Sequence, residues 1–169
     1  MKKGVLVFIL VFSSVCIYAQ DVGFMGITLG MARDEVLEFA DQKELIKVPK
    51  NRDVEFFPVE NRKILTLSIE PEVPHMYLQF YNDTLYAITV VFDERAVDYL
   101  TLARTLEKKY GPYAELTPSW RKWETGGSEI KVEKPAVVKY IALEEFLEVT
   151  NFRREKPVSD RETLLLEGL

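Results

Sequence analysis

Apolar and polar residues alternate through the middle of the chain, which is the pattern of half-buried β-strands. The first alternating run is residues 63–70 (KILTLSIE). Two further runs, residues 75–81 and 85–92, are separated by Asn82-Asp83-Thr84. Because Asn and Asp tolerate left-handed backbone, this segment is a turn signal, and the two runs are predicted to form a hairpin.

The alternation also assigns side chains to the two faces of this hairpin. One face is predicted to be apolar and to carry Met76, Leu78, Phe80, Leu85, Ala87 and Val91. The other is predicted to gather the tyrosines and to carry Tyr77, Gln79, Tyr81, Tyr86, Ile88, Val90 and Phe92. In this register Gln79 lies opposite Tyr86.

Three more strands are predicted after residue 119, at 120–125, 129–133 and 136–142. Gly126-Gly127 is the turn between the first two. Together with the runs before them, these segments predict an antiparallel sheet of five or six strands.

Two segments have the 3.6-residue rhythm of amphipathic helices. The first is residues 31–46 (MARDEVLEFADQKELI). The second is residues 93–110, with Asp93 as its N-cap and Gly111-Pro112 as its stop signal. Its apolar stripe is predicted to consist of Ala96, Tyr99, Leu100, Ala103, Leu106 and Tyr110. A short final helix is predicted within residues 143–152.

The first nineteen residues have the layout of a secretory signal peptide. Lys2 and Lys3 precede an apolar stretch, and Ala19 is a small residue at the expected cleavage position, which places the cut near Ala19-Gln20. Two alternatives stay open. The segment could remain as an uncleaved membrane anchor, or Cys16 could carry a lipid. The sequence then predicts one domain over residues 20–152 and a charged, loose tail over 153–169.

The acidic charge of the chain argues against two classes of partner. The formal net charge is −5, and loss of Lys2 and Lys3 with the leader lowers it to about −7. Nucleic-acid binding needs clustered cations, so it is not expected, and neither is docking on an anionic membrane by charge alone. Membrane attachment is expected only through an uncleaved leader or a lipidated Cys16, the chain's single cysteine.

No residue pattern points to catalysis, a cofactor or a metal. The chain has a single histidine, His75, which cannot form a metal site alone, and it has no G-x-S-x-G motif. Three carboxylates, Glu144, Glu145 and Glu148, have near-helical spacing, which is typical of a solvated helix face. Catalytic, cofactor-binding and metal-binding residues are therefore not assigned.

Five aromatic residues and one glutamine are the candidate partner-binding positions, which are Tyr77, Gln79, Tyr81, Tyr86, Trp120 and Trp123. Tyrosine on an open sheet face suits partner binding, since the ring gives contact area and the hydroxyl tolerates water. Alternatively, the C-terminal segment or another layer covers this face. The two tryptophans differ by three positions, so they are expected on opposite sides of a strand, with one in the core. The other either packs at the edge of the core or forms a rim contact near Arg121 or Lys122.

Two segments resemble small bacterial envelope lipoproteins. Residues 26–31 (GITLGM), followed by Glu35-Val36, and residues 77–88 (YLQFYNDTLYAI) are similar to the accessory lipoprotein of the outer-membrane β-barrel assembly machinery. That resemblance implies the α+β layout shared with β-lactamase-inhibitor-like proteins, in which helices pack on one face of an antiparallel sheet.

The sequence therefore predicts an α+β domain, with an antiparallel sheet of five or six strands and two main helices packed on one face. We expect an exported, noncatalytic envelope or periplasmic protein that binds another protein through its sheet face. The alternative is a small-ligand carrier with an aromatic pocket between sheet and helices. A hydrolase with dispersed acids is less favoured.

Overall fold

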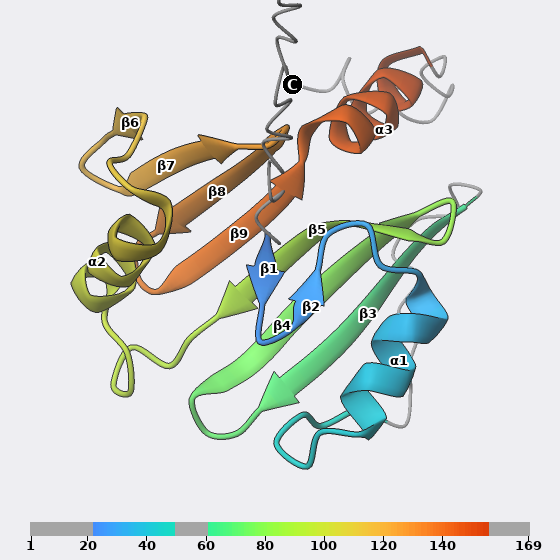
Figure 1. The fold of residues 1–169 in the computed structure, drawn as a ribbon, viewed down its shortest axis with the longest axis horizontal. Helices are drawn as coiled ribbons and strands as arrows, with labels where there is room; N and C mark the ends of the chain where they lie inside the picture. The colour runs from blue at the N-terminus through green and yellow to red at the C-terminus, as the bar shows by residue number, and fades with distance from the viewer. Residues whose placement is uncertain (1–21, 50–60, 156–169) are drawn as a thin grey trace, which may run out of the picture.

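The computed structural model describes residues 22–49 and 61–155 and shows an α+β fold (Figure 1). Its main sheet is antiparallel, with the strand order β3-β4-β5-β9-β8-β7-β6. The strands of this sheet are β3 (Arg62–Ile69), β4 (Val73–Tyr81), β5 (Thr84–Val91), β6 (Glu115–Leu116), β7 (Trp120–Thr125), β8 (Ser128–Glu133) and β9 (Val137–Ala142). The remaining elements are the small β1 (Gly23–Phe24) and β2 (Ile27–Thr28) pair and the helices α1 (Arg33–Asp41), α2 (Tyr99–Tyr110) and α3 (Leu143–Glu155).

The same structural unit occurs twice along the chain. A helix followed by a three-stranded meander occurs first as α1 with β3, β4 and β5, and again as α2 with β7, β8 and β9. The two meanders join where β5 pairs with β9, from Ala87 opposite Ile141 to Val91 opposite Val137. The main sheet is therefore continuous across both units.

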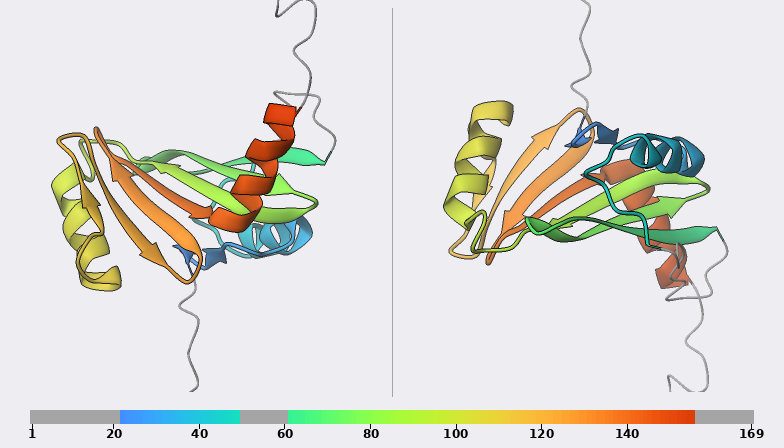
Figure 2. Two further views of the ribbon diagram at one scale, coloured as in Figure 1. Left: turned by 90° about the horizontal axis from the view of Figure 1, so that it is seen from above. Right: turned by 90° about the horizontal axis from the view of Figure 1, so that it is seen from below.

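The helices lie in two layers (Figure 2). Helices α1 and α2 cover one face of the sheet, which we call the inner face, and α3 lies against the opposite or outer face. Helices α1 and α2 are the two main helices expected on one face, whereas α3, expected as a short final helix, spans 13 residues and packs on the other face. Buried residues of α1 (Val36 and Ala40) and α2 (Leu102, Ala103 and Leu106) belong to the main core.

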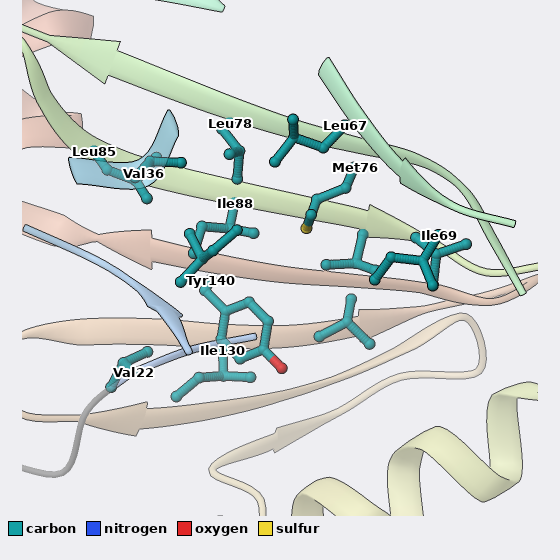
Figure 3. Close-up of a cluster of buried hydrophobic side chains, with 14 of the residues drawn as sticks. Val22, Val36, Leu67, Ile69, Met76, Leu78, Leu85, Ile88, Ile130 and Tyr140 are labelled. Carbon is teal, nitrogen blue, oxygen red and sulfur yellow. The ribbon is translucent and has the colours of Figure 1, made fainter. Parts of the chain in front are cut away.

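The core is built from alternate residues of neighbouring strands. Met76 and Leu78 of β4 pair with Val90 and Ile88 of β5, and Ile88 in turn pairs with Tyr140 of β9. Figure 3 shows these apolar side chains extending in one layer from Leu67 of β3 to Ile130 of β8. Since a period of two places alternate residues on one face, the strand pattern alone identifies this layer.

One part of the predicted hairpin register is wrong. A bulge between Gln79 and Phe80 shifts the pairing, so that Gln79 lies opposite Ala87 and not opposite Tyr86. Tyr86 is the extra residue in β5, so the expected faces are reversed from Ala87 onward, because a one-residue slip moves every later side chain to the other side. The buried core partners of β4 are consequently Leu85, Ile88 and Val90.

The predicted helices are shorter or shifted at their ends. Helix α1 spans 33–41 instead of 31–46, and α2 begins at Tyr99 with Asp98 as its N-cap. The Asp98 side chain accepts hydrogen bonds from the Thr101 backbone N–H (2.8 Å) and hydroxyl (3.2 Å). The predicted cap, Asp93, instead binds the Arg95 backbone N–H in a local turn.

The six predicted strands are present, and the seventh strand of the main sheet is the two-residue β6. The turns at Asn82-Asp83 and Gly126-Gly127 have the expected positive φ angles. Residues 153–155 of the predicted tail belong to α3. The predicted signal peptide, Cys16 and the rest of the tail lie outside the described residues. Within the described part, no helix has the length and apolar character needed to cross a membrane.

Candidate functional site

The outer face of the sheet carries most of the predicted partner-binding residues, and α3 covers one end of it. Val149 of α3 is buried against Tyr86 and Ala87 of β5. Three partly buried residues, Tyr81, Ile141 and Ala142, surround this contact. The alternative in which the C-terminal segment covers the tyrosine face is therefore confirmed at this end of the sheet.

Tyr86 is buried and only 2% exposed, so the expectation of an accessible Tyr86 is wrong. Its hydroxyl donates a hydrogen bond to Gln79 Oε1 at 3.0 Å and accepts one from Arg62 Nη2 at 3.3 Å. The bulge and the packing of Val149 explain this burial. Tyr86 and Gln79 do cluster, as expected, but they cluster as a structural pair.

Tyr77 remains accessible on the same face. It is 36% exposed, and its ring stacks on the ring of His75 with the centroids 5.9 Å apart. Tyr81 is half-buried at the edge of the α3 contact. The structure thus brings the exposed His75–Tyr77 pair to the part of the outer face that α3 leaves open.

The two tryptophans lie on opposite sides of β7, as predicted. Trp123 faces the core, is 2% exposed and donates its indole N–H to the Gly111 carbonyl oxygen at 2.8 Å. The expectation of Trp123 as a partner contact is therefore wrong, since the core and α2 enclose it. Trp120 is half-buried on the outer face, where Lys131 Nζ lies 4.6 Å from its ring centroid.

Charged residues cover the outer face of β7 and β8. Lys122 lies 2.7 Å from Glu115, 3.0 Å from Glu124 and 3.9 Å from Glu129. Hydrogen bonds to the first two carboxylates raise the pKa of the Lys122 ammonium above its usual range. Alternating Lys and Glu in residues 122–133 is the sequence signal for this network.

A second charged group continues this network toward β9. Glu133 lies 2.9 Å from Lys131 and 2.6 Å from Lys139. Burial alone would raise the pKa of the Glu133 carboxyl, but hydrogen bonds to the two ammonium groups outweigh it and hold the pKa below its ordinary value. Lysines and glutamates on the neighbouring strands β7, β8 and β9 therefore neutralise one another's charges.

A pocket of about 960 Å³ opens at the start of α2, and sequence reasoning did not find it. It is formed by the first turns of α2, the loop after β6 and the turn between β8 and β9. The lining residues are Glu94, Asp98, Tyr99, Leu100, Thr101, Arg104, Leu116, Thr117, Pro118, Arg121, Lys134 and Pro135. A pocket was expected between sheet and helices with an aromatic lining, whereas this one lies beside α2 and contains one aromatic residue.

Two positively charged side chains of this pocket lie beside the ring of Tyr99. Arg121 Cζ lies 5.9 Å from the Tyr99 ring centroid, and Lys134 Nζ lies 5.5 Å from it. Arg121 also lies 5.4 Å from the ring of Tyr113, so two tyrosines contact one guanidinium group. Three distant segments supply these groups, which is why no local motif marks them.

The described residues hold no group of three or more His, Cys, Asp or Glu side chains that could bind a metal ion. Two carboxylates, Glu94 and Asp98, do line the pocket. Hydrogen bonds from Thr101 hold the pKa of Asp98 below its ordinary value. A general acid of a glycosidase needs a raised pKa, so Asp98 is suited to capping α2 and not to that role.

Comparison with known proteins gives one match. A family model, that of the TP0088 domain, matches residues 22–151. No curated protein and no solved structure matches the chain. The matched region runs from the first described residue into α3, so it includes both the outer face and the pocket.

Proposed function

We propose that this chain, which belongs to the TP0088 domain family, is an exported, noncatalytic protein that binds another envelope protein through the open part of its outer face. The observation that carries the proposal is the stacked His75–Tyr77 pair, which stays exposed beside α3. Stacked aromatic rings offer a rigid contact area at low entropic cost, which is the character of interface hot spots.

The contrast between the two halves of the outer face supports this choice. On β7 and β8, lysines and glutamates pair with one another, and a partner would have to disrupt those ion pairs. On β4, Tyr77 stands between His75 and Gln79. A surface with aromatic rings and few charges costs less to desolvate than an ion-pair network.

Export rests on the leader-like sequence, and the envelope partner rests on the resemblance to accessory lipoproteins of outer-membrane β-barrel assembly. Both are proposals about residues or partners outside the described structure. N-terminal sequencing of the mature protein tests export. A chain that begins near Gln20 supports it, whereas an intact Met1 contradicts it. A lipid on Cys16 would instead support the alternative of an anchored lipoprotein.

The partner surface is tested with a photo-crosslinking amino acid at position 77 in cells. The captured protein is identified, purified and titrated against the wild type and Tyr77→Ala. We expect this variant to weaken binding by more than about 1 kcal/mol while leaving the chain folded. Tyr113→Ala is the control, because Tyr113 is also a tyrosine and is 37% exposed. Equal affinity of wild type and Tyr77→Ala would refute the proposed surface.

The pocket at the start of α2 favours a second candidate, the small-ligand carrier. Its volume of about 960 Å³ lies in the range of small-molecule sites. A hydrolase is less favoured, because the pocket carboxylate Asp98 serves as a helix cap.

A further inference from the structure

We propose that the pocket at the start of α2 binds a small molecule with one carboxylate group and an apolar body. This inference goes beyond the proposed protein-binding function and rests on the second candidate, the small-ligand carrier, whose ligand class it names. It concerns the inner side of the sheet, where α2 packs, and the two can be tested separately.

Arg121 is a preorganised anion-binding group in the pocket. Its guanidinium lies against the rings of both Tyr99 and Tyr113. Its Nε atom is buried and has no hydrogen-bond partner in the described part of the chain. A guanidinium that two tyrosine rings already hold in place can bind a carboxylate through its two Nη groups, since Nε is buried, with little further loss of side-chain entropy.

Charge balance favours a monoanion. Arg104, Arg121 and Lys134 line the pocket with Glu94 and Asp98, so one positive charge is left in excess. Asp98 already accepts hydrogen bonds from Thr101 and is therefore satisfied. One carboxylate would neutralise the excess, in a protein whose formal net charge is −5. A doubly charged phosphate would overcompensate it.

The apolar part of the lining explains why the ligand should have an apolar body. Leu100 and Leu116 are 51% and 54% exposed, although both are large apolar residues. Pro118 and Pro135 lie in the same lining. A hydrocarbon chain that covered these side chains would remove apolar surface from water, which favours binding.

The full mature protein can be titrated with octanoate, acetate, 1-octanol and inorganic phosphate, with binding followed by NMR. We expect octanoate to saturate one site and to shift the resonances of Tyr99, Leu100 and Leu116. Acetate lacks the apolar body and 1-octanol lacks the charge, so each should bind about tenfold more weakly or worse. Phosphate should also bind more weakly than octanoate.

Variants separate this site from nonspecific binding. Arg121→Gln should weaken octanoate about tenfold or more and leave 1-octanol unchanged. Lys131→Gln is the matched control, because Lys131 is also a cation over an aromatic ring but lies on the outer face. Arg104→Gln, on the exposed side of α2, repeats the test if Arg121→Gln fails to fold.

Three outcomes would overturn the proposal. The first is octanoate binding that does not saturate. The second is equal affinity for octanoate and 1-octanol, and the third is an octanoate affinity that survives both arginine substitutions. Loss of octanoate binding in Arg121→Gln with intact capture through Tyr77 would support the pocket and leave the proposed protein partner untouched.

Discussion

Tyr86 donates its hydroxyl hydrogen bond to Gln79 although the strand register places Ala87, and not Tyr86, opposite Gln79. The bulge in β5 makes this possible, since it adds one residue between the pairs Phe80–Leu85 and Gln79–Ala87. Tyr86 lies on the outer face, as alternation predicts, and the bulge adds Ala87 beside it, so that both pack against Val149. Tyr86 has the sequence context of a partner-binding tyrosine, but in the folded protein it forms the surface on which α3 packs.

This relationship predicts that Tyr86→Phe destabilises the protein by about 0.5–1.5 kcal/mol, because the variant loses the hydrogen bonds to Gln79 and Arg62. Tyr86→Ala should cost about 3–5 kcal/mol, since it also leaves a cavity under Val149. Urea unfolding measures both. Tyr77→Ala on the exposed neighbour should cost less than about 1 kcal/mol. A mild effect of Tyr86→Ala would show that α3 does not pack as described.

Leu106→Ala in α2 should reduce the free energy of unfolding by about 2–5 kcal/mol, because Leu106 is buried in the main core. Glu107→Ala changes the next residue, which is exposed, and should change stability by less than about 0.5 kcal/mol. Denaturant melts of the two variants test the helix phase directly. Comparable losses would mean that α2 presents a different side to the sheet.

The two tryptophans should report different environments in fluorescence. In Trp120→Phe the remaining Trp123 should emit at short wavelength and resist quenching by iodide, because it is buried. In Trp123→Phe the remaining Trp120 should be quenched more strongly. Trp123→Phe should also cost about 1–3 kcal/mol, through the lost hydrogen bond to Gly111 and the lost ring volume. Similar quenching in both variants would contradict the assigned sides of β7.

The pH dependence of stability should contain a contribution from Glu133. Its folded-state pKa is lowered from the ordinary value of 4.5, so its ion pairs stabilise the fold above that pH. The contribution is lost as pH falls below 4.5 through the folded-state pKa. The stability difference between wild type and Glu133→Gln should therefore be larger at pH 7 than at pH 3. Glu107→Gln controls for the loss of one exposed negative charge, and a difference independent of pH would refute the prediction.

The sequence predicts the fold well where one local rule decides the structure. Strand β7 spans 120–125 as predicted, and the turns at Asn82-Asp83 and Gly126-Gly127 occur where their residue types require them. The register error opposite Gln79 arises because the bulge at Tyr86 has no local signature here. Alternation carried past the bulge placed Ile88 and Val90 on the wrong face.

The candidate sites were less predictable, because they depend on tertiary contacts. Burial of Tyr86 requires Val149 of α3, which lies far along the chain from β5. No pattern within β5 indicates this contact. The pocket is similar, since Tyr99, Arg121 and Lys134 come from a helix, a strand and a turn. Each is ordinary in its own segment, and only the folded arrangement brings them together.

The pairing of β5 with β9 has a consequence for how the protein folds. Each meander consists of contacts between consecutive strands, which a chain can form quickly, whereas Ala87 and Ile141 must close a long loop before they pair. The strands at the centre of the finished sheet are therefore expected to join last. In a refolding experiment, protection of amide hydrogens along this central seam should lag behind protection within either meander.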